Sequence, residues 1–451
     1  MNVTEDLARF VVETPAEAIP GPVLHEGKRC LINFLGVALY AARDPSLDIM
    51  LDVFRHEGGR PNASVLGVGI RTSLQNAALA NGYLGHLEDY DDTHFPTVIH
   101  PSSPTLPASL AAGEHYGSSG RELLAASVLG MEACCRIGMA VHPAHYDAGF
   151  HITSTCGVFG SVGAAGRLMG LSTGQMVHGM GVAGTQAAGV REVMGSMTKP
   201  FHPGMAARAG VLGALLAGRG FTSATRILEG RRGFAAVMSR EHDLAEVTRG
   251  LGERWELRMN GLKPYACGVV AHPLIDAMIA LRSRVGQPAG QVERVDARVQ
   301  PLVLELMDRP DPKIGLEGKF SFQHSMAVGF IDGAAFPAQY TDARVVDPEV
   351  AALRGRIRAE VDGAMPEDAA EVTLTLKDGR SYTENVAHAT GAPQNPITDS
   401  QLEAKFRALA THALPNRRAE RLLAMLWDVD RLSGVGELMR LTRMPRSVAR
   451  D

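Results

Sequence analysis

Cysteine is scarce in this sequence, and its few copies are scattered. The chain of 451 residues has five cysteines: Cys30, Cys134, Cys135, Cys156 and Cys267. None of them forms the C-x-x-C pair that is typical of zinc and dithiol redox sites. An iron–sulfur cluster would need roughly three or four converging thiolates, which this spacing does not indicate. We therefore expect reduced thiols and neither a zinc nor an iron–sulfur centre.

The sequence also has little excess of charge of either sign, few aromatic residues and no long uncharged apolar run. The formal net charge is −4 and aromatic residues make up 5% of the chain, so we expect no nucleic-acid partner. The most apolar segment, residues 123–141, contains Glu132 and Arg136 and falls short of the roughly 18 uncharged residues of a membrane span. The acidic N-terminus lacks the features of a signal peptide. We therefore expect a cytoplasmic protein without a membrane partner.

Two common catalytic signatures are missing as well. No G-x-G-x-x-G or Walker loop follows a strand-like segment, and no G-x-S-x-G elbow is present. Nucleotide binding and serine hydrolysis are therefore disfavoured. The chemistry has to be sought in histidine, carboxylate and lysine side chains.

A helical pattern dominates residues 1–262. Apolar residues recur three and four positions apart in segments that are rich in Ala, Leu and Gly. Ser172 and Gln175 form a capping-box pattern, and Thr222 is placed to cap a further helical run. The many glycines inside these segments indicate close contacts between helices, which have to compensate for the low helix propensity of glycine.

The pattern changes after about residue 285. Residues 292–299 alternate like a strand, and so do 372–376 and 381–386, which flank a hairpin signal at Asp378-Gly379. Helical periodicity returns after Asn395-Pro396, with a capping box at Thr398. We predict a mainly α protein, in which residues 1–262 and 395–451 form a large all-helical domain. Residues 263–394 form a smaller α+β domain inserted into it.

The densest group of ionisable side chains lies between residues 86 and 100. It contains His86, Glu88, Asp89, Asp91, Asp92, His94 and His100. An imidazole can give or take a proton at neutral pH, and a neighbouring carboxylate can fix its tautomer. A charged surface loop is the alternative interpretation. Asp and His could also bind a metal ion, but no H-E-x-x-H or EF-hand spacing is present, and we predict no metal site.

Two lysines precede prolines in glycine-rich surroundings, Lys199 before Pro200 and Lys263 before Pro264. A lysine held in this way suits a substrate carboxylate and can stabilise an enolate-like charge. His151 precedes a Gly/Ala-rich helical segment, where an anion binds readily. His324, in the insert, is a further candidate for proton transfer. Surface lysines and histidines satisfied by the backbone are the alternatives.

Taken in chain order, these segments resemble the MmgE/PrpD family. The resemblance covers nearly the whole chain and is carried by Asn81-Gly82, His86, Asp89 to Thr93, His100 to Ser102, Phe150-His151, Thr198 to His202, Gly220 to Thr222, Leu228 to Gly230, Lys263 to Tyr265, His272-Pro273, Lys319 to Ser321 and Asn395-Pro396. Each segment is unspecific by itself, but their order is specific.

The resemblance implies a helical domain with a smaller lid domain, a homodimer, and neither cofactor nor metal. It places a site between the domains. The residues that match family site positions are Asp89, Thr93, His100, His151, Lys199 and Lys263, and His202 lies in the same segment as Lys199. His324 stands where many relatives have a tyrosine, which makes it a candidate second proton-transfer group.

The family includes 2-methylcitrate dehydratases, iminodisuccinate epimerases and cis-aconitate decarboxylases. We predict an acid–base enzyme acting on a small di- or tricarboxylic acid, with a hydro-lyase ranked first, an epimerase second and a decarboxylase third. The predicted catalytic residues are His100, Asp89, His151 and His324, and the predicted substrate-binding residues are Thr93, Lys199, Lys263 and His202. A non-catalytic interaction protein is the remaining alternative.

Overall fold

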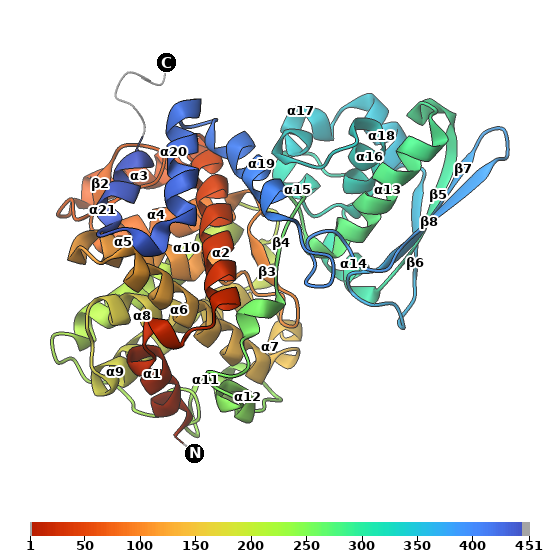
Figure 1. Ribbon diagram of the computed structural model, residues 1–451. Helices are drawn as coiled ribbons and strands as arrows, with labels where there is room; N and C mark the ends of the chain where they lie inside the picture. Colours follow the sequence, from red (N-terminus) through yellow and green to blue (C-terminus); the bar gives the residue numbers. More distant parts are fainter. Residues whose placement is uncertain (1, 444–451) are drawn as a thin grey trace.

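Helices build the larger of two lobes in the computed structural model, which describes residues 2–443. This lobe lies on the left in Figure 1 and joins the N-terminal part of the chain to its C-terminal return. Its helices are α1 (Val3–Glu13), α2 (Gly21–Ala41), α3 (Pro45–Glu57), α4 (Leu74–Leu87), α5 (Ser102–Tyr116), α6 (Gly120–Val141), α7 (Ala144–Asp147), α8 (Ile152–Leu168), α9 (Thr173–Gly184), α10 (Thr198–Ala217), α11 (Phe234–Met238), α12 (Ala245–Thr248), α19 (Asp399–Ala410), α20 (Asn416–Trp427) and α21 (Val435–Leu441). A short pair of strands, β1 (Ala63–Ser64) and β2 (Arg71–Thr72), lies beside them.

Small residues allow the helices of this lobe to approach closely. Gly82 of α4 lies against α10, where a Cβ atom on Gly82 would be 2.7 Å from the Cα atom of Gly204. This contact sets the end of α4, which leads to Asp89, beside the start of α10, which carries Lys199. The close helix contacts predicted from the glycine content are therefore present, and they position two of the predicted site residues.

The most apolar long helix, α6, belongs to the core of the large lobe. By length and composition it could cross a membrane, but 94% of its most apolar window is buried. Two of its charged residues, Glu132 and Arg136, are fully buried and form an ion pair with 2.7 Å between Oε1 and Nε. Pairing of this kind makes two buried charges tolerable in a protein core.

The smaller lobe, on the right in Figure 1, combines helices with a four-stranded sheet. Its elements are α13 (His272–Val285), β5 (Val292–Val299), α14 (Pro301–Met307), α15 (Gly315–Gly318), α16 (Phe322–Asp332), α17 (Asp342–Val345), α18 (Pro348–Arg354), β6 (Ile357–Val361), β7 (Ala370–Leu376) and β8 (Ser381–Val386). The predicted mainly α fold, with a large helical domain and a smaller α+β domain, is thus confirmed. The domain limits at residues 263 and 394 stay a prediction.

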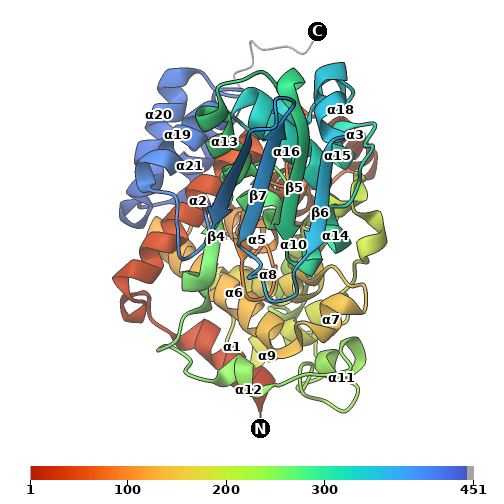
Figure 2. The ribbon, with the colours of Figure 1, turned by 90° about the vertical axis from the view of Figure 1, so that its right-hand side faces the viewer.

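The strand order in the sheet is β6-β5-β7-β8. β5 runs parallel to β6 and antiparallel to β7, and β7 and β8 form an antiparallel hairpin. α13 packs against β7 and β8, whereas Figure 2 shows the opposite face of the sheet without a covering helix. Buried and partly exposed residues accordingly alternate along β7. The strand predicted at 292–299 and the hairpin around Asp378-Gly379 are confirmed.

Helix caps account for two boundaries in the large lobe. Ser172 and Gln175 form a capping box at the start of α9, and Thr398 and Gln401 form another at the start of α19, as predicted. The prediction for Thr222 is wrong, because residues 221–224 are irregular, residues 225–233 form turns and bends, and the next helix, α11, begins at Phe234. Gly220, with a left-handed φ of 87°, favours an end of the preceding helix over its continuation.

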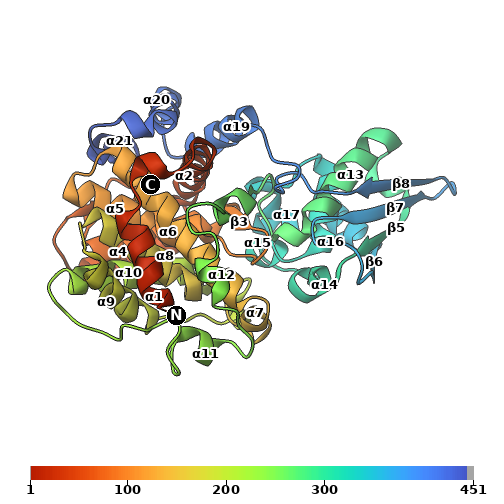
Figure 3. The ribbon, with the colours of Figure 1, turned by 60° about the horizontal axis from the view of Figure 1, so that its bottom comes forward.

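The two lobes meet at a short antiparallel strand pair, β3 (Asp92–His94) and β4 (Asn260–Leu262). Thr93 lies opposite Gly261 in this pair, and Figure 3 shows β3 at the junction of the lobes. β3 follows the loop that contains Asp89, and Lys263 comes directly after β4. The strand pair therefore fixes two chain segments far apart in the sequence beside each other.

Candidate active site

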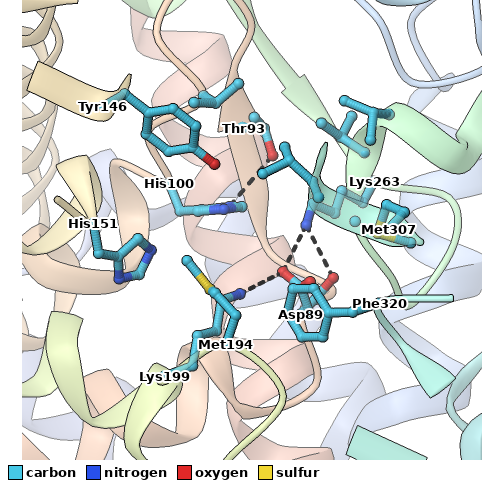
Figure 4. A pocket seen from close by; sticks show the side chains of 15 residues that line it. Asp89, Thr93, His100, Tyr146, His151, Met194, Lys199, Lys263, Met307 and Phe320 are labelled. Carbon is cyan, nitrogen blue, oxygen red and sulfur yellow. Dashed lines mark hydrogen bonds and ion pairs between the residues drawn. The ribbon is translucent and has the colours of Figure 1, made fainter. Parts of the chain in front are cut away.

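A pocket lies where the lobes meet, with about 570 Å³ of empty space that includes space open to solvent, and Figure 4 shows its side chains. It is lined by Asp89, Thr93, Val98, His100, Tyr146, His151, Met194, Lys199, Lys263, Gly268, Val269, Val270, Leu306, Met307 and Phe320. Six of the eight residues predicted from the sequence are among them, and the exceptions are His202 and His324.

Two lysines converge on one oxygen of Asp89. The Nζ atoms of Lys199 and Lys263 both lie 2.8 Å from Asp89 Oδ1, and Lys263 also donates to the Asp89 main-chain carbonyl at 3.1 Å. Burial alone would raise the pKa of the Asp89 carboxyl, but the two ammonium groups hold it well below its usual range. Burial lowers the pKa of Lys199, against the effect of Asp89. Two cations thus share one anion, which leaves positive charge for a substrate carboxylate.

Backbone strain is concentrated at this pocket. Within residues 2–443, the non-glycine residues with positive φ are Asp89, at 50°, and Val98, at 53°, and both line the pocket. A left-handed backbone costs a non-glycine residue on the order of 1 kcal/mol or more and persists where surrounding contacts enforce it. At Asp89 these contacts are the hydrogen bond from its own N–H to the His86 carbonyl and the two lysines.

His100 presents one ring nitrogen to the pocket. Its Nδ1 lies 2.7 Å from the main-chain oxygen of Asp92, and Thr93 Oγ1 lies 3.3 Å from the same nitrogen. A carbonyl oxygen can only accept, so Nδ1 carries the proton and Nε2 has the free electron pair. Burial lowers the pKa of His100 to about 3, so the ring is neutral at pH 7. This arrangement leaves the electron pair of Nε2 free to accept a proton.

A buried network lies beneath His100. His86 Nδ1 is 2.7 Å from Asp91 Oδ2, which also accepts a hydrogen bond from Ser103. The His86 and His100 rings meet edge to face with 4.7 Å between their centroids. Burial would raise the pKa of Asp91, but His86 and His100 keep it well below its usual range. The charged Asp91 lies 3.4 Å from His100 Nδ1, where it would stabilise a protonated ring.

Asp92 differs from its two charged neighbours. Its Oδ2 accepts hydrogen bonds from Ser102 Oγ at 2.6 Å and Asn260 Nδ2 at 2.7 Å. No lysine or arginine pairs with it in the described structure, and burial together with the charge of Asp91 raises its pKa to about 6. Asp92 therefore links β3 to β4. Its carboxyl group is also protonated more readily than an exposed carboxyl group.

His151 and His202 face each other through their Nδ1 atoms. The two Nδ1 atoms are 3.0 Å apart, so one ring donates a proton and the other accepts it. Burial lowers the pKa of His151 well below its usual range and that of His202 to about 4. His202 contacts the pocket through His151 rather than lining it. If His151 Nδ1 is the acceptor, its Nε2 carries a proton that can be delivered to a substrate.

The side chains of His86, Asp89, Asp91 and His100 could also hold a metal ion, since one ligand-type atom from each lies within 4.8 Å of the others. Their present partners fit this less well. Asp89 Oδ1 already binds two ammonium groups, and Asp91 Oδ2 already binds His86 and Ser103. A divalent cation here would lie close to two lysine charges, which costs free energy in a buried site. The donor set suits proton transfer better.

The structure does not bring His324 into the pocket, contrary to the expectation from the sequence. His324 lies in the first turn of α16, fully buried inside the smaller lobe. Its Nε2 is 2.8 Å from the Gln339 main-chain oxygen, and its ring packs edge to face on Tyr340. The His324 N–H donates to Ser321 Oγ, which caps the helix, and His324 does not line the pocket.

Several residues of the pocket were not singled out from the sequence. Apolar side chains of the smaller lobe face the charged floor, namely Val269, Val270, Leu306, Met307 and Phe320. The larger lobe adds Met194, Val98 and Tyr146. These residues lie in short irregular segments or short helices without a periodic pattern, so nothing in the local sequence marks them. Only the fold brings them to one place.

With this geometry in place, comparison with known proteins identifies the class. Residues 5–247 match the MmgE/PrpD N-terminal domain and residues 265–431 match the MmgE/PrpD C-terminal domain. The chain therefore belongs to the MmgE/PrpD family.

Relatives match over almost their full length. A cis-aconitate decarboxylase of Aspergillus terreus is 26% identical over 98% of this chain and 96% of its own length. A cis-aconitate decarboxylase of Mus musculus is 26% identical over 98% of this chain and 94% of its own. A 2-methylcitrate dehydratase of Cupriavidus necator is 23% identical over 96% of this chain and 95% of its own.

Proposed function

We propose that this protein is a cofactor-independent acid–base lyase that acts on a small di- or tricarboxylic acid. The observation that carries the proposal is the neutral His100, whose Nε2 faces the pocket beside the two lysines on Asp89. Family membership supports the same class, since the named relatives act on carboxylic acids.

The arrangement favours dehydration. Lys199 and Lys263 bind a substrate carboxylate, and His100 Nε2 takes the proton from the carbon next to it. The electron pair left behind resembles an enolate, which the two ammonium groups stabilise. That pair then forms the carbon–carbon double bond as a hydroxyl group leaves from the neighbouring carbon. The hydroxyl takes the proton that His100 now carries and departs as water, while the Nε2–H of His151 donates a hydrogen bond to it.

Decarboxylation is the second candidate, and the cis-aconitate decarboxylases among the relatives favour it. This reaction needs no initial base. It needs a proton donor for the carbanion that remains after CO2 leaves, and the neutral His100 does not carry a proton on Nε2. We rank dehydration first because it uses the free electron pair of His100 Nε2, for which decarboxylation has no need.

The test is proton NMR of the purified, EDTA-treated protein in D2O with 2-methylcitrate, citrate, cis-aconitate, malate and iminodisuccinate, each alone. Dehydration gives olefin signals together with deuterium at the carbon next to a carboxylate. Loss of CO2 without prior exchange identifies a decarboxylase, and inversion with exchange identifies an epimerase. Activity that returns only with added divalent ions would contradict the metal-independent mechanism, and an inert protein under all conditions would contradict the proposed function.

The predicted homodimer and cytoplasmic location are part of the same proposal. Light scattering of the purified protein at several concentrations tests the first, and fractionation of the source cells tests the second.

A further inference from the structure

Tyr146 lies on the wall of the pocket opposite the lysines. It belongs to the short helix α7, and its side chain is 6% exposed. In Figure 4 its hydroxyl group points into the pocket, towards His100 and Thr93. Tyr146 therefore offers a polar atom to the same space as the predicted catalytic residues.

The hydroxyl of Tyr146 differs from those of the other buried tyrosines. The buried tyrosines among the described residues are Tyr83, Tyr90, Tyr146, Tyr265 and Tyr340. Four of them donate to a partner. Tyr83 donates to Ser46 Oγ, Tyr90 to the Pro264 carbonyl, Tyr265 to Asp276 and Tyr340 to Ser325 Oγ. Tyr146 has no such bond within residues 2–443. Because this hydroxyl faces the pocket, it is available to a ligand.

The ring of Tyr146 is held firmly while its hydroxyl is unbound. The guanidinium carbon of Arg191 lies 4.0 Å from the ring centroid, and Arg191 also donates to the Tyr146 main-chain oxygen at 3.0 Å. The other end of the guanidinium group pairs with Glu305 of α14, in the smaller lobe, at 2.6 Å. Arg191 thus ties Tyr146 to both walls of the pocket, which keeps its orientation fixed at little further entropic cost when a ligand binds.

The phenol stays protonated, and therefore remains a donor, across the working range. Burial raises the pKa of Tyr146 to about 12, although the Arg191 charge acts in the opposite direction. Phenol and lysines thus approach a bound acid from different sides of the pocket.

We propose that Tyr146 is a further catalytic residue, whose hydroxyl donates a hydrogen bond to a substrate oxygen that gains negative charge during the reaction. No proton changes hands in this step: the hydrogen bond strengthens as charge moves onto the oxygen and weakens again when the product forms. The inference rests on the proposed acid–base function. It deepens that function, because it assigns a donor outside the lysine pair and outside the histidines.

The experiment compares Tyr146→Phe with Tyr83→Phe in the same D2O exchange assay, using the acid on which the wild-type protein is fastest. Phenylalanine keeps the ring for Arg191 and removes only the hydroxyl. Loss of one donor to a developing oxyanion lowers kcat by about 100-fold, with KM changed by less than about threefold. Tyr83→Phe removes a hydroxyl bonded to Ser46, away from the pocket, and should leave kcat unchanged.

Thermal unfolding separates this role from a structural one. Because the Tyr146 hydroxyl has no protein partner, its removal should leave the midpoint unchanged or raise it, whereas Tyr83→Phe should lower it. Wild-type kcat in Tyr146→Phe, or a lowered unfolding midpoint that accounts for lost activity, would overturn the inference while the proposed function stands. A wild-type protein that exchanges no acid in the panel would overturn both.

Discussion

The ammonium group of Lys405 donates a hydrogen bond to the main-chain carbonyl of Lys263, with 2.7 Å between Nζ and O. Lys405 also donates to the Tyr90 carbonyl at 2.8 Å and to Asn33 Oδ1 at 2.7 Å, and it lies over the Tyr90 ring. It comes from α19, in the C-terminal return of the chain. The return thus supports the two segments that carry Asp89 and Lys263, without itself lining the pocket.

Replacing Lys405 with Met should destabilise the protein by about 3 kcal/mol, because three buried acceptors lose their shared donor. Urea unfolding measures this, with Lys377→Met as a control on the exposed hairpin turn. If Lys405→Met has the same free energy of unfolding as the wild-type protein, Lys405 does not support the segments that carry Asp89 and Lys263.

Asp89→Asn removes the charge that Lys199 and Lys263 share. Two buried ammonium groups then repel each other without a counter-ion, and we expect a loss of about 3–5 kcal/mol in stability. The lysines also lose their fixed positions, so kcat/KM for exchange should fall by at least about 100-fold. Glu132→Gln is the matched control: it breaks the buried pair with Arg136, so it should lose stability but keep activity once folded. Equal exchange rates in Asp89→Asn and wild type would count against the assigned site.

Asp92→Asn should change how stability depends on pH. Because the folded state raises the pKa of Asp92 from 3.8 to about 6, it binds this proton more tightly than the unfolded chain does. The resulting stabilisation is fully present below pH 3.8 and is lost as the pH rises through about 6. The shift corresponds to about 3 kcal/mol.

Asparagine cannot titrate, so the wild-type protein should gain stability relative to Asp92→Asn as the pH falls from 7 to 4. Urea unfolding of both proteins at several pH values measures the difference. A difference that does not vary with pH would show that folding leaves the pKa of Asp92 unchanged.

Gly82→Ala should lower both the stability of the protein and its activity. The added Cβ atom would meet the backbone of α10 at Gly204, so the helices have to move apart, at a cost of about 1–3 kcal/mol. The movement would separate the loop of Asp89 from Lys199 and lower kcat/KM. Gly174→Ala, in α9, is the control, because its Cβ atom meets nothing within 4 Å and alanine favours a helix. Equal stability of the two variants would contradict the close packing.

Much of the fold and part of the site could be predicted from the sequence. Periodicity and capping residues such as Thr398 are local signals, and they predicted the helical and α+β segments because local preference and tertiary packing agree there. The dense group between Asp89 and His100, and the lysines before proline, were visible because ionisable residues are rarely clustered without a reason.

The remainder depends on contacts between distant segments. His324 was expected in the pocket, but a cap at Ser321 and a carbonyl acceptor at Gln339 hold it elsewhere. Tyr146 lines the pocket, and Lys405 supports the segments that carry Asp89 and Lys263. Neither residue belongs to a motif. A side chain's direction in a short helix such as α7, and the partner of a buried ammonium group, are set by tertiary structure, which no local pattern encodes.

In the proposed reaction, the neutral His100 takes a proton from the carbon next to a carboxylate. The most direct test is the rate at which deuterium from D2O enters that carbon, measured by proton NMR for wild type and His100→Gln at pH 7. Glutamine can still donate to the Asp92 carbonyl, so the variant should fold, yet it has no basic nitrogen. We expect exchange in His100→Gln to fall to the background rate while the unfolding midpoint stays close to that of wild type. Exchange at the wild-type rate in the folded variant would contradict this role of His100.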